Sequence, residues 1–394
     1  MIGFQRKDGR KGIRNVVLVV YLVECAHHVA REIAGAFSSE PVHLVGFPGC
    51  YPNAYAHRVL ESVATHPNVG AVLLISLGCE SFDRESLAAA VEASGRPVAT
   101  IVIQETGGTA RSIELGRTIV SDFLRKLDDV PRTPIEPADL IVGTICGGSD
   151  ATSGLTANPA CGRAFDLLIE AGGTAIFEET SELIGCEHLM AERAASPELG
   201  REIVAAVEKA ARYHQVLGHG SFAPGNAEGG LSTIEEKSLG AYAKSGQSTI
   251  SGILKPAVRP PRPGLYLLDV VPDGDVRFGF PNIVDNAEIV ELVSCGCHLV
   301  LFTTGRGSVV GSVISPVVKV CANPDTYRRM KDDMDINAGK ILDGSSDLDQ
   351  VGKEIYDRIL RTAAGEPTAS ERLGHREFIL GYKRFEPLGP ACLP

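Results

Sequence analysis

The sequence predicts an α/β protein in which parallel-sheet lobes carry helices on both faces, arranged as two or three subdomains. Short apolar runs of strand length alternate with amphipathic runs of helix length, and this rhythm is typical of parallel sheets. The apolar runs are continuous rather than alternating, which indicates strands buried on both faces. A chain of 394 residues has room for two or three such domains.

The first lobe is expected over residues 1–130, where four apolar runs are each followed by a helical run. The expected strands are VVLVVYLVE, HLVGF, AVLLISLG and VATIVI. The stretch DDVPRTPIEPAD comes next, and we interpret its prolines and charges as a linker.

A central α/β lobe is expected over residues 131–260 and a C-terminal α/β segment with a tail over 261–394. The central lobe offers the strands DLIVGTI and TAIFEE, a helix from about Pro159, and two helices over about 181–217. The prolines of the stretch VRPPRPG indicate another boundary between domains. The last segment offers the strands GLYLLDV, HLVLFTT and PVVKVCA.

Charge and hydropathy exclude several classes of protein. The chain carries 49 acidic and 38 basic residues, a net charge of −11, which argues against a nucleic-acid binder. Its longest apolar run, VVLVVYLV, is too short to span a bilayer, and the charged start MIGFQRKDGRKGIRN lacks the apolar core of a signal peptide. We therefore expect a cytoplasmic protein whose ten cysteines are buried, catalytic or metal-binding rather than disulfide-bonded.

The stretch CGGSDATSGLTANPACG joins an expected strand to an expected helix with almost no bulky side chain. Asn158 and Pro159 are typical of an N-cap and the first helical position. Glycines let a ligand approach the backbone closely, and free N–H groups at a helix N-terminus favour an anion. The alternative is a tight connection that needs positive φ. The expected substrate-binding residues of this loop are Ser149, Asp150, Thr152, Ser153 and Thr156.

A second bare loop, FTTGRGSVVGSVISP, follows the strand HLVLF. Its GRGSVVG departs from the dinucleotide fingerprint in spacing, and a strand rather than a helix follows it. We therefore interpret Arg306 as a guanidinium offered to a carboxylate or phosphate, with a solvated turn as the alternative. Arg14 and Asn15, just before the first long strand, are further substrate-binding candidates; the alternative for them is a solvated basic start.

Cys25, Cys50 and Cys79 each lie just past the carboxyl end of an expected strand in the first lobe. In an open parallel sheet those ends share one edge, where ligands bind. Three thiolates there are typical of an iron site, mononuclear or cubane. The alternative is that the three cysteines are buried and pack in the core as small apolar side chains.

Proton-transfer candidates come from two charged stretches. FEETSELIGCEHLMAERA contains Glu179, Glu182, Glu187 and His188, acidic groups after an expected strand and a histidine on the following helix. They suit metal ligation or proton transfer, with a solvated helix face as the alternative, and Glu187 and His188 are taken as the catalytic candidates. NAEGGLSTIEEKSLGAYAK places Lys237 between an acidic pair and an expected Ser-Leu-Gly turn, as a base or a carboxylate anchor, or as an ordinary surface lysine. The CGCH stretch is expected to be buried.

The chain resembles the altronate/galactarate dehydratase family, the large catalytic part of sugar-acid hydro-lyases. The matching motifs span about residues 3–342 in order. They are GFQRKDGRKGIRN, SLGCE, CGGSDATSGLTANPA, EETSELIGCEHLMAERA, GGLSTIEEKSLG, FTTGRGS and DINAGKI. The stretch GFPGCYPNAYA departs from the family, whose sugar-acid dehydratases carry a second glycine after the cysteine.

The resemblance implies β-elimination of water from a sugar acid to give a 2-keto-3-deoxy acid, with Fe²⁺ or Mn²⁺ as cofactor. It also implies a small domain before the DGR motif; either a separate small subunit supplies it here or the enzyme works without it. We also expect a homo-oligomer, a dimer. The same family includes sulfolactate sulfo-lyase, and the three strand-end cysteines favour dehydration over that reaction. The remaining alternatives are a nucleotide-dependent oxidoreductase and a non-catalytic sugar-acid-binding subunit.

Overall fold

The computed structural model describes residues 1–218, 224–274 and 284–383. Contacts divide them into two units. The N-terminal unit contains residues 2–134, 284–290 and 377–383, and the larger unit contains residues 135–274 and 291–376. The expected linker therefore lies at the division between the units. In the described part of the chain, no helix combines the length and the apolar character that crossing a membrane requires.

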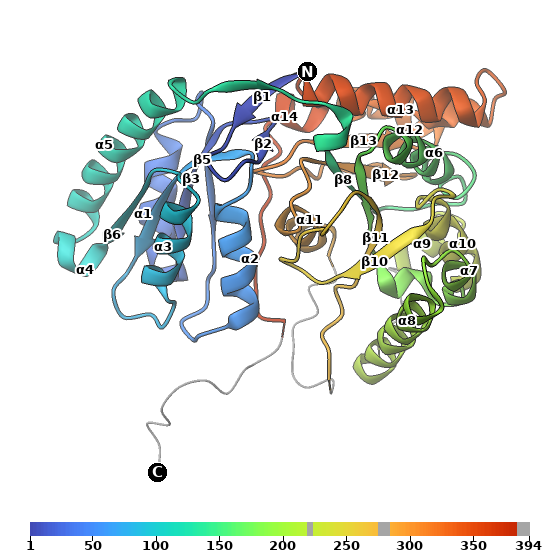
Figure 1. Ribbon diagram of the computed structural model, residues 1–394, viewed down its shortest axis with the longest axis horizontal. Helices are drawn as coiled ribbons and strands as arrows, with labels where there is room; N and C mark the ends of the chain where they lie inside the picture. The colour runs from blue at the N-terminus through green and yellow to red at the C-terminus, as the bar shows by residue number, and fades with distance from the viewer. Residues whose placement is uncertain (219–223, 275–283, 384–394) are drawn as a thin grey trace, which may run out of the picture. The chain divides into compact units, whose positions relative to one another are not determined.

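The N-terminal unit is built on a four-stranded parallel sheet in the order β4-β3-β5-β6 (Figure 1). The strands are β3 (Val16–Tyr21), β4 (Val42–Gly46), β5 (Val69–Ser76) and β6 (Val98–Val102). The helices are α1 (Glu24–Gly35), α2 (Ala54–Ala64), α3 (Arg84–Ala93), α4 (Ile103–Thr106) and α5 (Thr109–Asp128). A small antiparallel sheet joins β1 (Ile2–Gln5) to β2 (Lys11–Gly12) and β7 (Arg132–Pro134).

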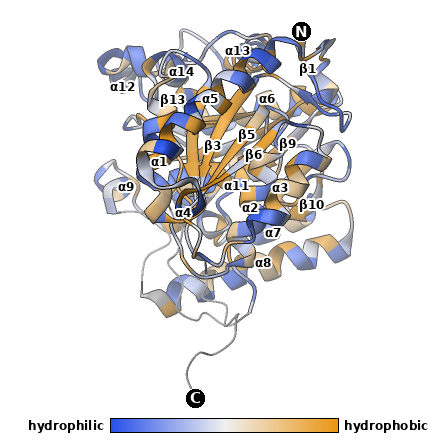
Figure 2. Ribbon diagram, turned by 90° about the vertical axis from the view of Figure 1, so that its left-hand side faces the viewer, coloured by the Kyte–Doolittle hydropathy of each residue, from blue (hydrophilic) through white to orange (hydrophobic). Residues whose placement is uncertain are grey.

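The expected strands form because their apolar side chains are covered on both faces. Every residue of β5 is buried, and Figure 2 shows the central strands in the orange of hydrophobic residues. On one face, Ile33 of α1 and Phe123 of α5 pack with Val17 and Val19 of β3. The continuous apolar runs thus did indicate two-sided burial.

The larger unit contains a seven-stranded parallel sheet in the order β10-β11-β9-β8-β12-β13-β14. The strands are β8 (Ile141–Cys146), β9 (Thr174–Phe177), β10 (Ile250–Leu254), β11 (Gly264–Leu268), β12 (Leu299–Thr304), β13 (Val317–Cys321) and β14 (Ile336–Asn337). This sheet takes strands from both sides of residue 260, and residues 255–263 join two neighbouring strands.

The helices of the larger unit connect these strands or cover the sheet (Figure 1). They are α6 (Ala157–Glu170), α7 (Glu187–Glu192), α8 (Pro197–Leu217), α9 (Pro224–Glu228), α10 (Ile234–Ala243), α12 (Pro324–Arg329), α13 (Leu348–Ala363) and α14 (Ala369–Leu373). Helix α11 (Asp285–Ser294) precedes β12. The parallel-sheet α/β prediction is confirmed.

Two local predictions are wrong. Helix α6 begins at Ala157, so Asn158 lies inside it rather than at its N-cap. Its side-chain amide instead donates to Gly240 O at 2.9 Å and its oxygen accepts from Thr303 Oγ1 at 2.7 Å, a use that sequence spacing does not reveal. The expected Ser-Leu-Gly turn is part of α10, where Gly240 has no Cβ and so lets the backbone of Gly154 approach closely.

Strand order places a topological switch at β8. The chain passes from β8 to β9 on one side, whereas β12 lies on the other side of β8. In open α/β sheets the crevice at the carboxyl ends of such strands is where ligands bind. Strand β8 ends at Cys146, the first residue of the expected ligand loop.

Candidate active site

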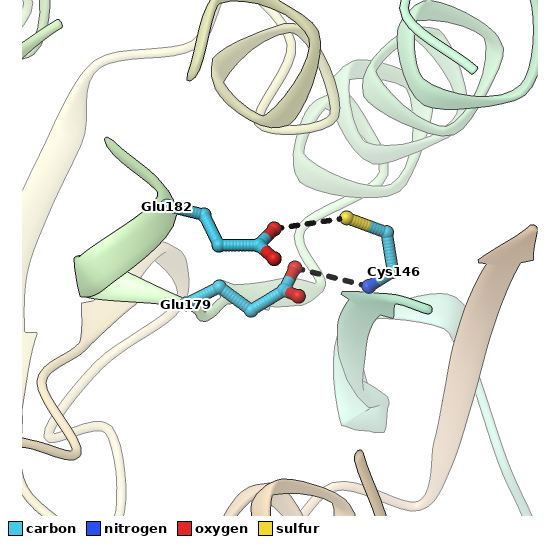
Figure 3. Close-up of side chains that lie close together, drawn as sticks. All are labelled: Cys146, Glu179 and Glu182. Carbon is cyan, nitrogen blue, oxygen red and sulfur yellow. Dashed lines mark hydrogen bonds between the residues drawn. The ribbon is translucent and has the colours of Figure 1, made fainter. Parts of the chain in front are cut away.

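Cys146 lies at the carboxyl end of β8, beside two acidic side chains (Figure 3). Its backbone N–H donates to Glu179 Oε2 at 3.0 Å, and its thiol lies 3.3 Å from Glu182 Oε2. Glu179 and Glu182 follow β9, the neighbouring strand, so two adjacent strand ends supply all three groups. Their donor atoms lie within 4.8 Å of one another.

Lys237 of α10 and Lys244, the C-cap residue directly after this helix, complete the site. Lys237 Nζ lies 3.0 Å from Cys146 Sγ, 2.5 Å from Glu182 Oε2 and 3.1 Å from Ser149 Oγ. Lys244 Nζ lies 3.2 Å from Cys146 Sγ and forms an ion pair with Glu179. Seven residues separate the lysines, which is two helical turns, so both point from one face of the helix.

We call Cys146, Glu179, Glu182, Lys237 and Lys244 the buried cluster. The side chains of Lys237 and Lys244 are 3% and 0% exposed. Burial alone lowers the pKa of Lys237, but the negative charges of Cys146 and Glu182 outweigh it and hold the pKa above its usual value. Lys237 is therefore an ammonium at neutral pH, suited to stabilising negative charge rather than to accepting a proton.

Glu179 is held in an unusual backbone conformation at the start of the turn after β9. Its φ is +81°, in the left-handed region that side chains other than glycine rarely adopt. Strain of this kind persists where surrounding contacts fix the residue, and it is common at active sites. Here the fixing contacts are the Cys146 N–H and the Lys244 ammonium.

The thiol and the two carboxylates are donor types that could hold a metal ion. Their ligand atoms, however, already face ammonium groups: Lys237 contacts the Cys146 thiol and the Glu182 carboxylate, and Lys244 contacts Glu179. A metal ion bound here would compete with the two lysine side chains for the same ligand atoms.

The loop after Cys146 is braced by Asp150, which is buried. One carboxylate oxygen accepts from the Thr152 N–H at 2.9 Å and the Thr152 hydroxyl at 2.6 Å. The other oxygen accepts from Asn323 Nδ2 at 3.0 Å. A Cβ on Gly305 would lie 2.1 Å from this carboxylate, so only glycine fits there.

Most hydroxyls of this loop are used inside the protein. The Ser153 hydroxyl faces Asp150, and Thr156 Oγ1 donates to the carbonyls of Thr152 and Ala322. The Ser149 hydroxyl contacts the buried cluster, through Lys237. The structure thus brings the expected residues Ser149 and Lys237 together.

The two bare loops lie side by side. The N–H groups of Gly305 and Arg306 donate to Gly148 O at 3.1 and 2.8 Å. The Arg306 guanidinium donates to Gly225 O and lies 3.6 Å from Glu228 Oε2, with 43% of its side chain exposed. Exposed ion pairs of this kind are weak, so an anion could compete for the guanidinium.

Glu187 and His188 do not join the buried cluster in the structure. The Glu187 carboxylate accepts from the Gly185 N–H at 2.7 Å at the start of α7, and His188 is exposed. Arg14 and Asn15 lie at the amino end of β3 in the N-terminal unit, where Arg6 donates to the Arg14 carbonyl and to Asn15 Oδ1. The functional roles of these four residues stay predictions.

Cys25, Cys50 and Cys79 lie past the carboxyl ends of β3, β4 and β5, as the sequence predicts. All three are exposed, so they do not fill the core. Within the described ranges, their thiols do not meet the 4.8 Å spacing that the buried cluster meets. Their role in binding metal stays a prediction. The CGCH stretch is buried, as expected.

Sequence reasoning missed Cys146 and Lys244. It named Glu179 and Glu182 among the acidic candidates but took Glu187 and His188 as the catalytic pair. A usable signal exists for Lys244, because it lies seven residues after Lys237, which is about two helical turns. Cys146 and Glu179 carry a weaker signal, since each lies at or just after the end of a neighbouring apolar run.

The fold and the buried cluster define an α/β enzyme with acidic and basic side chains at the switch point of a parallel sheet. Comparison with known proteins then gives the family. Residues 137–385 match the family model of the D-galactarate/altronate dehydratase C-terminal domain, and residues 3–128 match that of the D-galactarate dehydratase/altronate hydrolase second domain. The chain belongs to the galactarate/altronate dehydratase family and is a lyase.

Three curated relatives indicate the range of the family. The (2R)-sulfolactate sulfo-lyase subunit beta of Chromohalobacter salexigens is 34% identical over 96% of both chains. The altronate dehydratase of Escherichia coli is 31% identical over 96% of this chain and 76% of the relative. The galactarate dehydratase (L-threo-forming) of Escherichia coli is 34% identical over 80% of this chain and 61% of the relative.

Proposed function

We propose that this lyase removes water from a sugar acid of the altronate or galactarate type to give a 2-keto-3-deoxy acid. The observation that carries the proposal is the buried Lys237 ammonium, paired with Glu182 and Cys146 at the switch point of the sheet. Loss of the C2 proton places negative charge on the substrate carboxylate, and a fixed cation stabilises that charge.

The reaction needs one proton acceptor and one proton donor. The C2–H electron pair forms the C2=C3 bond, the C3–O bond breaks, and the departing hydroxide takes a proton to become water. The enol then becomes the 2-keto acid. We assign Glu182 as the acceptor because its side chain is 14% exposed, whereas that of Glu179 is 4% exposed and pinned by Lys244.

The substrate carboxylate is proposed to lie at Ser149 and Arg306, on the two adjacent loops. Ser149 contacts Lys237 directly, and a guanidinium can bind a carboxylate through two parallel hydrogen bonds. Asp150 and Thr152 act on this subsite by bracing the loop. The iron that the resemblance implies is proposed to bind at Cys25, Cys50 and Cys79 rather than at the buried cluster.

A second candidate is sulfo-lyase chemistry, in which a C–S bond breaks at C3 and sulfite leaves instead of water. The observation that favours it is the match to the sulfo-lyase subunit beta over 96% of both chains. Because that relative is named as one subunit of an enzyme, a partner subunit for this chain is part of the proposal.

One experiment separates these activities. The purified chain is incubated anaerobically with a panel of sugar acids and with sulfolactate, with and without Fe²⁺, and both keto acid and sulfite are measured. Keto acid from a sugar acid without sulfite supports dehydration. Sulfite from sulfolactate supports the second candidate. Binding of an acid without either product would indicate a non-catalytic subunit.

A further inference from the structure

Glu228 faces Arg306, the arginine proposed to bind the substrate carboxylate. Its Oε2 lies 3.6 Å from Arg306 Nη1, and within the described ranges no other carboxylate pairs with this arginine. We propose that Glu228 occupies Arg306 while no acid is bound and competes with the substrate carboxylate for it, so that Glu228 sets how tightly the lyase binds its acid. This inference rests on the proposed carboxylate subsite and adds a residue that controls its affinity.

The backbone beside Glu228 is packed against both bare loops. The Ala151 N–H donates to Gly229 O at 3.2 Å. A Cβ on Gly229 would lie 3.1 Å from Ser149 O and 3.2 Å from Arg306 Cδ. Glycine at position 229 therefore lets the end of α9 lie directly against the two loops that form the proposed subsite.

The guanidinium of Arg306 has two acceptors in one short helix. Arg306 Nη1 donates to Gly225 O in α9 and also faces the Glu228 carboxylate in the last position of the same helix. A substrate carboxylate that takes two parallel N–H groups of the guanidinium has to compete with these acceptors. Helix α9 therefore holds the arginine in the acid-free enzyme.

The connection from α9 to α10 is short and hydrogen-bonded. The Leu231 N–H donates to Asn226 O at 3.2 Å. The Ser232 N–H and the Ser232 hydroxyl both donate to Glu236 Oε2 at 2.7 Å, in the first turn of α10. Since α10 carries part of the buried cluster, these bonds hold α9 at the same site.

The ion pair is weak enough for a substrate to replace it. The side chain of Arg306 is 43% exposed and that of Glu228 is 74% exposed. Exposed ion pairs usually change an equilibrium by about fivefold or less. Acid binding thus exchanges one carboxylate for another at Arg306, and the exchange lowers the affinity for the acid by about twofold to fivefold.

The first test examines the ion pair without any substrate. The wild-type chain, Glu228→Gln and the charge control Glu235→Gln are treated with phenylglyoxal, which reacts with guanidinium groups, and peptide mass spectrometry gives the labelling rate of each arginine. Glu235 is exposed in the first turn of α10 and so matches the loss of one surface charge. Arg328, which pairs with Asp325 on α12, gives a reference rate.

We expect Arg306 to be labelled at least twofold faster in Glu228→Gln than in the wild type and in Glu235→Gln, with the rate at Arg328 unchanged. A neighbouring carboxylate stabilises the charged guanidinium, whereas the reagent attacks the neutral form. Equal rates at Arg306 in the three proteins would overturn the pairing.

The second test measures acid binding. Isothermal titration calorimetry with altronate, galactarate and sulfolactate gives dissociation constants for the same three proteins, and steady-state kinetics follow for the acids that are turned over. We expect Glu228→Gln to lower the dissociation constant of a bound acid by about twofold to fivefold and to change KM more than kcat. The difference should shrink in about 0.5 M NaCl, because salt screens exposed charges.

Failure of this inference differs from failure of the proposed reaction. If no acid of the panel is turned over, the proposed reaction fails, whereas faster labelling of Arg306 in Glu228→Gln would still show that Glu228 occupies it. If folded Glu228→Gln, checked by circular dichroism, binds no acid more tightly than the wild type, the competition is overturned. The same holds if Glu235→Gln tightens binding equally, because the effect would then come from net charge.

Discussion

Lys237 Nζ lies 2.5 Å from Glu182 Oε2, and both groups come from elements that meet at the end of β8. The pair joins a helix to the turn after β9, although 55 positions separate the two residues in the sequence. The proposed reaction assigns the cation role to Lys237 and the proton-acceptor role to Glu182.

Glu182→Gln is expected to reduce kcat at least a hundredfold while leaving the fold intact. The amide keeps the shape of the side chain but cannot take up the C2 proton. The matched control is Glu187→Gln, five residues after Glu182, where the carboxylate accepts from the Gly185 N–H. Steady-state kinetics on both variants shows which of the two carboxylates the reaction needs. Loss of activity in the Glu187 variant alone would move the acceptor role to α7.

Arg306→Lys is expected to lower kcat/KM by about tenfold or more. The lysine keeps the positive charge but loses the paired hydrogen bonds of a guanidinium, and tenfold corresponds to about 1.4 kcal/mol. Arg328→Lys on the surface helix α12 serves as control. Unchanged kinetics with the best acid in the panel would remove Arg306 from the carboxylate subsite.

Asp150→Asn is expected to raise KM and to lower the free energy of unfolding by about 1–3 kcal/mol. An amide can present only one acceptor oxygen, so the paired bonds to Thr152 and the bond to Asn323 cannot all be kept. Urea unfolding and kinetics are measured on the same preparation. A variant with wild-type stability and wild-type KM would show that the carboxylate does not brace the loop.

Acid should remove a stabilising contribution of Asp8 in the N-terminal unit. Burial alone raises the pKa of Asp8, but Arg10 and Arg96 outweigh it and hold the pKa at about 2. Since the folded pKa is depressed, the contribution is complete above about pH 4 and is lost as pH falls towards 2. Asp8→Asn should therefore cost about 1 kcal/mol near pH 6, after screening by water, and progressively less in acid.

Urea unfolding at pH values from 6 to 3 measures that difference. Asp129→Asn is the control, because Asp129 is exposed at the end of α5 in the same unit. A difference between wild type and Asp8→Asn that did not change with pH would assign its cost to packing rather than to charge.

The fold was predictable because a strand that is buried on both faces needs a continuous run of apolar residues, and such runs are visible in the sequence. Continuous apolar runs marked β3, β5 and β12, and small residues marked the two loops that meet at Gly148. The start of α6 was not predictable, since Asn158 is used by Gly240 and Thr303, which are distant in sequence.

The site was predictable only in part. Lys237 and Ser149 were selected from local motifs, and the structure brings them within 3.1 Å. Glu179 and Glu182 were named among the acidic groups after an expected strand, but Glu187 was taken as catalytic together with His188 on the following helix. Which glutamate faces the lysines depends on how the turn after β9 packs against α10. Sequence periodicity predicts single elements and cannot predict this tertiary contact.

The central claim is that Lys237 is the cation of a lyase site, and its removal tests the claim most directly. Turnover of the acid that gives most product is measured for wild type, Lys237→Arg, Lys237→Met and the surface control Lys353→Ala, with folding checked by circular dichroism. We predict a loss of at least a hundredfold for Lys237→Met, a smaller loss for Lys237→Arg and wild-type rates for the control. A folded Lys237→Met variant that forms keto acid at the wild-type rate would contradict the account.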